Sequence, residues 1–258
     1  MTEKHDIVND NEIRFFGQRR SGHHAIMNWV YAHFSGPSGY VNEISKIDQI
    51  DINSHFKNAT IEEIELDRKG TSFFKKECLI LNVEDADLKL ASEEIEKSKF
   101  YPRGRSKKIT NILILRDPFN LFASRLKKSM NDGTSEVHWI GENSVRTWIQ
   151  HAKEFLNETN YLGDNLVTIS YNHWFSDIDY RRQISEKLDL KFTDDGFLTV
   201  PSHGGGSSFD GVSKNQNANT MEVLQRWRVF EGDERLKTIF ENNVILNLSK
   251  AIFGDILN

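Results

Sequence analysis

The sequence predicts an α/β fold of three layers, in which helices flank a parallel β-sheet on both faces. Short runs that are almost entirely apolar indicate strands buried on both faces, and they lie at 13–16, 78–83, 109–115 and 166–170. Helical periodicity follows, with apolar residues on one face of 119–126 and 145–156. A glycine-spaced turn joins the first strand to a helix. Since no linker rich in Pro, Gly and Ser divides the 258 residues, we expect a single domain, 1–258.

The composition narrows the classes of partner. A formal net charge of −5 argues against a general nucleic-acid binder. No apolar run approaches the length of a membrane span, and the first residues do not form a signal peptide, so we expect no membrane partner and a cytoplasmic location. The single cysteine, Cys78, lies beside apolar residues and is expected to be a buried structural thiol.

The turn after the first strand has the composition of a phosphate-binding site. Gly17 and Gly22 are spaced as in the first half of the nucleoside-triphosphate loop, but His23 and His24 replace the Lys-[Ser/Thr] pair that should follow. Glycines allow a tight turn, and the first N–H groups of the next helix point at a bound anion. Without the lysine and the magnesium-binding hydroxyl, the turn can hold a nucleotide phosphate but lacks the parts for metal-assisted transfer of a terminal phosphate.

The helix after this turn carries an apolar stripe that includes Ile26 and Trp29, so its start is expected to be anchored on the core. The stretch around 35–75 that follows is rich in polar residues and contains Gly36-Pro37-Ser38-Gly39. We expect it to form an excursion over the carboxyl edge of the sheet or a peripheral cap.

Two acidic residues, Glu84 and Asp85, follow the second apolar run. In a doubly wound sheet the ligand lies outside the carboxyl ends of the strands, so either carboxylate is placed to accept a proton there. The alternative is that one of them caps a helix that begins near Ala86.

The third apolar run ends in Arg116-Asp117-Pro118. The Asp-Pro pair stops the strand and opens a helix with proline in its first turn, and Ser124 lies two turns beyond Arg116. The long arginine and the short hydroxyl can converge on a second phosphate. The alternative is that Arg116 pairs with a carboxylate and Ser124 is an ordinary helix residue.

Together these segments resemble the PAPS-dependent sulfotransferases, which move a sulfuryl group from 3′-phosphoadenosine 5′-phosphosulfate (PAPS) to a hydroxyl or amine. The family's [Lys/Arg]-Ser-Gly-x-x loop, which holds the 5′-phosphosulfate, corresponds to Arg20-Ser21-Gly22-His23-His24. Its Arg-[Asp/Asn]-Pro motif with a serine eight residues after the arginine, which holds the 3′-phosphate, corresponds to Arg116, Asp117, Pro118 and Ser124. The resemblance implies a sheet related to that of the P-loop nucleotide kinases.

Two further segments extend the resemblance. Tyr171, after the fourth apolar run, corresponds to the tyrosine near the adenine, and the loop from Gly204 to Gly211 corresponds to one that closes over the donor. The alternative for this loop is a flexible surface turn before a helix that contains Arg226. The resemblance thus implies that the donor is held by Arg19, Arg20, Ser21, Gly22, His23, His24, Ala25, Arg116, Ser124, Tyr171, Gly206, Ser207, Ser208 and Phe209.

The mechanism that the resemblance implies is an in-line displacement at sulfur, with Arg20 neutralising charge on the leaving 5′-phosphate oxygen. The donor is already activated, so no metal is required. Glu84 is our first choice for the base that takes the acceptor's proton and Asp85 our second, while His23 or His24, where the family commonly has threonines, can instead act as base or sulfate ligand. The catalytic candidates are Arg20, Glu84, Asp85 and His24.

The sequence defines the acceptor only as a small molecule or saccharide, with a hydroxyl favoured over an amine. Arg125, Lys127 and Lys128 either form a solvated rim or attract an anionic acceptor. Trp139, Trp148 and Trp174 are candidates for stacking on a sugar, although the helical pattern favours the core for Trp148. Two other functions remain open, a nucleotide or small-molecule kinase with a degenerate loop and a non-catalytic nucleotide-binding protein. The oligomeric state is not predicted.

Overall fold

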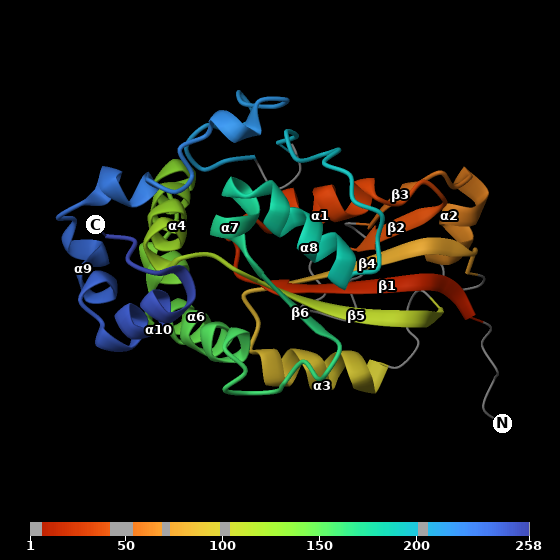
Figure 1. The fold of residues 1–258 in the computed structure, drawn as a ribbon, viewed down its shortest axis with the longest axis horizontal. Helices are drawn as coiled ribbons and strands as arrows, with labels where there is room; N and C mark the ends of the chain where they lie inside the picture. The colour runs from red at the N-terminus through yellow and green to blue at the C-terminus, as the bar shows by residue number, and fades with distance from the viewer. Residues whose placement is uncertain (1–6, 42–53, 69–72, 99–103, 201–205, 258) are drawn as a thin grey trace.

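A six-stranded sheet in the order β3-β2-β4-β1-β5-β6 forms the centre of the molecule (Figure 1). The computed structural model describes residues 7–41, 54–68, 73–98, 104–200 and 206–257. Neighbouring strands of this sheet are parallel except for the pair β2 and β3. The strands are β1 (Ile7–Gly17), β2 (Ser38–Val41), β3 (Ser54–Lys57), β4 (Lys76–Glu84), β5 (Arg105–Leu115) and β6 (Leu166–Ser170).

The four strands predicted from apolar runs are confirmed as β1, β4, β5 and β6. Side chains alternate between the two faces of β1, and both faces are covered. Phe15 is buried in the cluster that contains Ile26, while Phe16 is buried with Leu88 on the other side. Burial on both faces explains why the runs are apolar at consecutive positions rather than at alternate ones.

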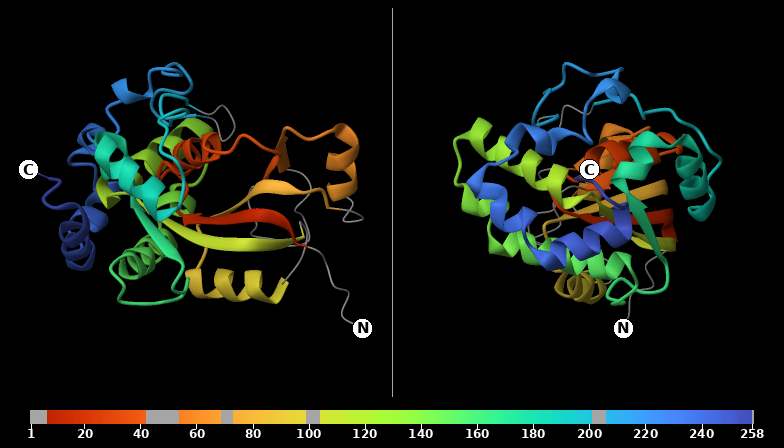
Figure 2. Two further views of the ribbon diagram at one scale, coloured as in Figure 1. Left: turned by 45° about the vertical axis from the view of Figure 1, so that its right-hand side comes forward. Right: turned by 60° about the vertical axis from the view of Figure 1, so that its left-hand side comes forward.

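Helices cover both faces of the sheet, which confirms the three-layer prediction (Figure 2). One face packs against α1 (His23–Ala32), α7 (Tyr171–Ser176) and α8 (Ile178–Lys187), and the other against α3 (Leu88–Ser98). Beyond the carboxyl ends of the strands a second apolar cluster joins α4 (Pro118–Asp132), α6 (Glu142–Phe155), α9 (Glu234–Phe240) and α10 (Asn243–Phe253). The other described elements are α2 (Ile61–Arg68), α5 (Glu136–Ile140), η2 (Ala218–Thr220) and η3 (Arg226–Phe230).

The segment around 35–75 contains elements that the sequence did not predict. Within its described part, β2 pairs with β4 and β3 pairs with β2, so this segment extends the sheet at one edge. Strands of only four residues that contain glycine and serine give no periodic signal. Residues 42–53 and 69–72 of the expected cap lie outside the described residues. A single domain with a peripheral cap stays a prediction.

The starts of two helices decide between alternatives left by the sequence. Asp117 is the N-cap of α4, and its side chain accepts a hydrogen bond from the N–H of Asn120 at 2.9 Å, as the Asp-Pro pair predicted. At α3, Asp87 accepts from the N–H of Leu90 at 3.0 Å. The cap of α3 is therefore neither Glu84 nor Asp85, because the helix starts further along the chain than the sequence indicated.

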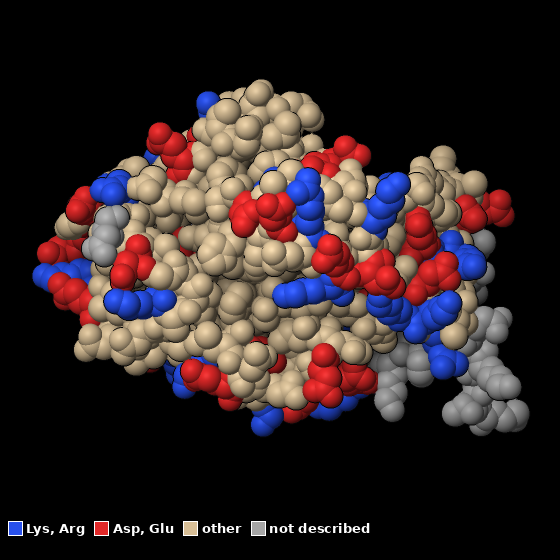
Figure 3. Space-filling view, in the orientation of Figure 1, with Lys and Arg blue, Asp and Glu red and all other residues tan. Residues whose placement is uncertain are grey.

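Two further features concern the distribution of surface charge and the length of the helices. Acidic and basic side chains are interspersed over the face drawn in Figure 3. Of the helices in the described ranges, none is long and apolar enough to cross a membrane.

Candidate active site

The turn between β1 and α1 contains two residues with positive φ. Arg20 has a φ of 73°, and Gly22, the N-cap of α1, has a φ of 84°. A Cβ atom on Gly22 would lie 2.0 Å from Cε2 of Tyr171, so a larger residue does not fit against this ring. The turn brings the start of α1, where N–H groups lack helical partners, to the carboxyl end of the central strand. This is the arrangement of an anion site.

Arg20 connects this turn to the loop at 206–211. Its Nη2 donates a hydrogen bond to the carbonyl of Gly206 at 2.8 Å. Two other residues of this loop accept hydrogen bonds from Nη2 of Arg226, Ser207 through its Oγ at 2.7 Å and Asp210 through a carboxylate oxygen at 3.0 Å. Burial, together with the charge of Arg226, lowers the pKa of Arg20 to about 10. Arg20 is thus charged at neutral pH and lies close to a second cation.

Arg116, at the end of β5, is buried and joins the two predicted phosphate motifs. Its Nη1 donates to the carbonyl of Arg20 at 3.0 Å and to Oγ of Ser124 at 3.1 Å, and its Nη2 donates to the carbonyl of Val223. These partners are carbonyls and a hydroxyl, so the ion pair with a carboxylate that the sequence left open is not what holds this side chain. Burial and the charge of Arg226 lower the pKa of Arg116 to about 10.

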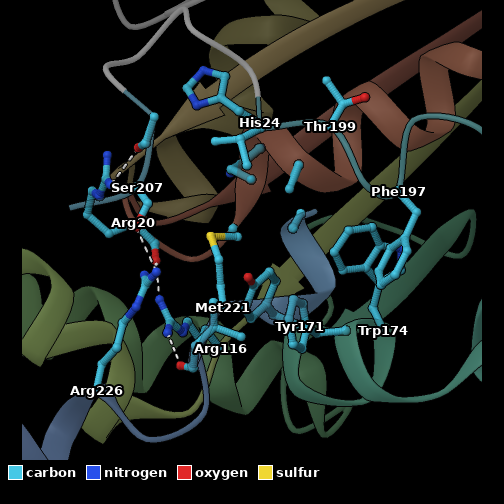
Figure 4. Close-up of a pocket in the computed structure, with 18 residues that line it drawn as sticks. Arg20, His24, Arg116, Tyr171, Trp174, Phe197, Thr199, Ser207, Met221 and Arg226 are labelled. Carbon is cyan, nitrogen blue, oxygen red and sulfur yellow. Dashed lines mark hydrogen bonds between the residues drawn. The ribbon is translucent and has the colours of Figure 1, made fainter. Parts of the chain in front are cut away.

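A cavity lies between the turn, α7 and residues 197–200 and 206–226. Figure 4 shows the arginines on one side of it, Trp174 and Phe197 on the other, and Tyr171 with Met221 between them. The three guanidinium groups that line the cavity belong to Arg20, Arg116 and Arg226. The cavity therefore has a cationic end and an aromatic end.

His23 lines this cavity and lies against Glu84. The His23 side chain is buried, and neither of its ring nitrogens has a hydrogen-bond partner among the described residues. Its Nδ1 lies 3.9 Å from Oε1 of Glu84. Burial and the neighbouring rings of His24 and His151 hold the pKa of His23 well below its ordinary value, so its imidazole is neutral at neutral pH. Glu84 itself does not line the cavity.

The architecture is shared with known structures. No protein-family model and no curated protein matches this sequence. The sulfotransferase domain of the Synechococcus PCC 7002 olefin synthase matches with a TM-score of 0.55 and 14% identity, over 96% of this chain and 97% of that one. A sulfotransferase domain from the curacin biosynthetic pathway matches with a TM-score of 0.52 and 14% identity, over 93% of this chain and 96% of that one.

This chain has the sulfotransferase fold. Within that fold, predicted donor-binding residues from four separate segments meet at the cavity. The predicted donor-binding residues that line it are Arg20, Gly22, His23, His24, Ala25, Arg116, Tyr171, Gly206 and Ser207. Ser21 and Ser124 are buried close by, and Ser124 accepts the hydrogen bond from Arg116.

Other predicted residues lie outside the lining. Phe209 lies beneath Arg226, whose guanidinium carbon is 4.9 Å from the ring centre. Ser208 is buried, and its carbonyl accepts from Asn131 at 2.8 Å. The Nε of Arg19 lies 3.8 Å from a carboxylate oxygen of Glu84 and 3.8 Å from one of Asp85. Gly204 and Gly205 of the expected loop are outside the described residues.

The structure adds residues to the site of this sulfotransferase fold that the sequence did not single out. Arg226 was expected only as part of a helix, and the structure has a short 3₁₀ helix, η3, that starts there. Phe197 and Met221 lie in irregular segments without periodicity. Because these segments reach the cavity only through tertiary packing, no local signal marks them.

Among the residues considered for the acceptor, Arg125 is placed differently from the prediction. Arg125 is buried, with 2% of its surface exposed, and pairs with Asp85 at 2.6 Å, so it neither forms a solvated rim nor reaches an acceptor. Lys128 pairs with Asp132 at 2.7 Å. Trp148 lies in the core, as the helical pattern favoured. In the described parts of the chain, no group of three or more His, Cys, Asp and Glu side chains is arranged to hold a metal ion.

Proposed function

We propose that this protein transfers a sulfuryl group from PAPS to the hydroxyl group of a small-molecule or saccharide acceptor. The observation that supports this most is the 3.0 Å hydrogen bond from Arg116 to the carbonyl of Arg20. Through it, the two predicted phosphate sites lie side by side at one end of the cavity. PAPS carries phosphate groups at two positions and a flat base, which matches a cavity with a cationic and an aromatic end.

The charges around the cavity suit a ligand with more than one negative charge. Burial and mutual repulsion lower the pKa of both Arg20 and Arg116 to about 10, with Arg226 as the nearby cation in each case. Such repulsion is relieved when anionic groups lie between the guanidinium groups. Arginine also binds phosphate oxygens through two parallel hydrogen bonds. The donor set therefore fits a doubly phosphorylated nucleotide.

When bound, PAPS would supply a sulfuryl group that its anhydride bond already activates. The work left to the chain is positioning and neutralisation of charge. We assign Arg20 and the N–H groups at the start of α1 to the oxygen that leaves. We assign Arg116 and Ser124, which already contact each other at 3.1 Å, to the 3′-phosphate. Tyr171 would pack against the adenine ring of PAPS.

For the acceptor's proton we propose Glu84, with His23 between it and the cavity. His23 is one of the residues that line the cavity, and the Nδ1 of its buried, neutral ring is 3.9 Å from a carboxylate oxygen of Glu84. A carboxylate behind an imidazole favours the tautomer that carries hydrogen on the near nitrogen, which leaves the other nitrogen able to accept a proton. In this proposal Nε2 of His23 takes the acceptor's proton and Nδ1 releases its own proton to Glu84, which requires the 3.9 Å gap between them to close.

Glu84→Gln is expected to lower the rate of transfer by about 10²-fold or more, the usual contribution of a positioned base. Affinity for adenosine 3′,5′-bisphosphate should stay nearly unchanged, because the nucleotide contacts arginines and the turn. Release of the bisphosphate in the presence of a panel of hydroxyl compounds measures the rate, and titration calorimetry measures the affinity. Glu96→Gln is the control, since Glu96 is 66% exposed. Unaltered transfer by Glu84→Gln would move the base elsewhere, with His24 as the next candidate.

The test of the proposed function compares two nucleotides by thermal shift. Adenosine 3′,5′-bisphosphate at one hundred times its dissociation constant should stabilise the protein by about 2.7 kcal/mol. ATP with magnesium should give a smaller shift at the same concentration, since the turn lacks the lysine and hydroxyl that a kinase uses. A preference for ATP with magnesium would contradict the proposal and favour a kinase. If the protein binds the bisphosphate but does not form it from PAPS with any acceptor of the panel, a non-catalytic nucleotide-binding protein is favoured.

A further inference from the structure

The Arg125 side chain makes four hydrogen bonds next to the phosphate turn, and it takes no part in the proposed chemistry. Its guanidinium donates hydrogen bonds to the carboxylate of Asp85 at 2.6 Å, to the carbonyl of Arg19 at 3.2 Å and to Oγ of Ser144 at 3.1 Å. A further bond goes to the carbonyl of Trp139. Arg125 therefore ties the turn to α5 and α6, which lie outside the nucleotide motifs.

Asp85 completes this arrangement from the end of β4. Its Oδ1 accepts a hydrogen bond from the N–H of Arg19 at 3.1 Å, and its own N–H donates to the carbonyl of Gly17 at 3.0 Å. Asp85 has a φ of 56°, in the left-handed region that costs a non-glycine residue free energy. Arg19 is thus held at both ends, its N–H by Asp85 and its carbonyl by Arg125.

The turn needs such support because of its own conformation. Arg20 has a φ of 73° although it is not glycine, and a backbone of this kind persists only where surrounding contacts hold it. The carbonyl of Arg19 is bound by Arg125, and the carbonyl of Arg20 by Arg116. Two arginines from α4 and the end of β5 therefore fix consecutive peptide groups of the turn.

We propose that Asp85 and Arg125 form a positioning pair that holds the phosphate turn in its anion-binding shape, and that Asp85 is not the base. The pair lies behind the turn, and neither residue lines the cavity. The identity of the bound anion rests on the proposed function, but the effect on the shape of the turn does not. This assignment gives Asp85 a role through the backbone of Arg19 rather than through contact with substrate.

Two substitutions at Asp85 separate positioning from proton transfer. Asp85→Asn keeps an oxygen that can accept from Arg19 and Arg125, so kcat/KM for PAPS should stay within about fivefold of the wild type. Asp85→Ala removes this oxygen, and the misplaced turn should lower kcat/KM by about 10–100-fold. If Asp85 were the base, both variants would lose activity to the same extent, because neither Asn nor Ala can take a proton. Equal loss in both variants would therefore overturn the proposal.

Arg125→Lys tests the other half of the pair, and it is milder than removal of the whole side chain. Lysine cannot make the four hydrogen bonds of the guanidinium, so the same loss of kcat/KM is expected, without a change in its pH profile. The double variant Asp85→Ala with Arg125→Lys should be little worse than the worse single variant, since both residues hold the same part of the turn, Arg19. Losses that multiply would contradict a shared role. Arg182→Ala is the matched control, because Arg182 pairs with Asp179 at the same 2.6 Å but is 52% exposed.

Amide hydrogen exchange without nucleotide keeps this inference separate from the proposed function. Peptides that cover residues 17–22 should exchange faster in Asp85→Ala and Arg125→Lys than in the wild type and in Arg182→Ala. Unchanged exchange would overturn the positioning role, whatever the protein binds. Faster exchange in a protein that fails to bind adenosine 3′,5′-bisphosphate would support the positioning pair and contradict the sulfotransferase proposal.

Discussion

Arg116→Ala is expected to weaken the binding of adenosine 3′,5′-bisphosphate by about 100-fold, the range found when one partner of a buried charged hydrogen bond is removed. Three effects add. The variant loses the proposed contact with the 3′-phosphate, frees the hydroxyl of Ser124, and leaves the carbonyls of Arg20 and Val223 without the donor that they have in the structure. Titration calorimetry with the bisphosphate measures the change.

Arg116→Lys and Arg182→Ala are the comparisons for this experiment. Lysine keeps the charge but not the fork that reaches both the Arg20 carbonyl and Ser124, so it should recover only part of the affinity. Arg182 is an exposed arginine on α8 and should have no effect. Unaltered affinity in a folded Arg116→Ala protein would show that this guanidinium does not contact the nucleotide, and the proposed function would lose its main support.

Gly22→Ala is expected to have the largest effect on stability, a loss of about 2–4 kcal/mol from backbone strain and overpacking together. The added Cβ would lie 2.0 Å from Cε2 and 2.1 Å from Cδ2 of the Tyr171 ring, a buried side chain that stacks on Trp174. The φ of 84° adds strain of its own. Chemical denaturation measures the free energy of unfolding, and nucleotide affinity should fall with it because the turn and the ring must separate.

Gly163→Ala separates the two causes. Gly163 has a φ of 74°, close to that of Gly22, but a Cβ there would meet nothing within 4 Å. Its substitution should cost only the strain, about 1–2 kcal/mol. The difference between the two variants then measures the contact with Tyr171. Equal losses would mean that the ring moves aside at no cost and that the turn does not depend on it.

Much of the fold could be predicted because its signals are local. β4 and β5 are apolar over consecutive residues since both of their faces are buried, and Asp117-Pro118 marks the start of α4 within a single turn. The edge strands β2 and β3 escaped prediction for the opposite reason, because four residues that include glycine or serine carry no period. The capping role considered for Glu84 and Asp85 was wrong, since the chain continues to Asp87 before α3 begins.

The candidate site also contains residues that could be predicted from the sequence and residues that could not. Arg20 and Arg116 could be found from sequence because each lies within three residues of the carboxyl end of a strand, and strand ends in a parallel sheet share one edge. The role of Arg125 could not be found, because its position on α4 next to Ser124 says nothing of the carbonyl of Arg19 that it binds, 106 residues away. An arginine in a basic stretch is usually solvated, and this one is buried.

The parallel α/β architecture and the two motifs that contain Arg20 and Arg116 can be predicted from the amino-acid sequence alone, since periodicity, glycine spacing and strand ends are properties of neighbouring residues. Which of these groups come into contact depends on tertiary packing. Arg116 reaches the carbonyl of Arg20 across 96 residues and that of Val223 across 107, and burial together with the nearby charge of Arg226 lowers the pKa of Arg20 and of Arg116. Contacts between residues so far apart in sequence form only when the layers pack, so no local sequence pattern predicts them.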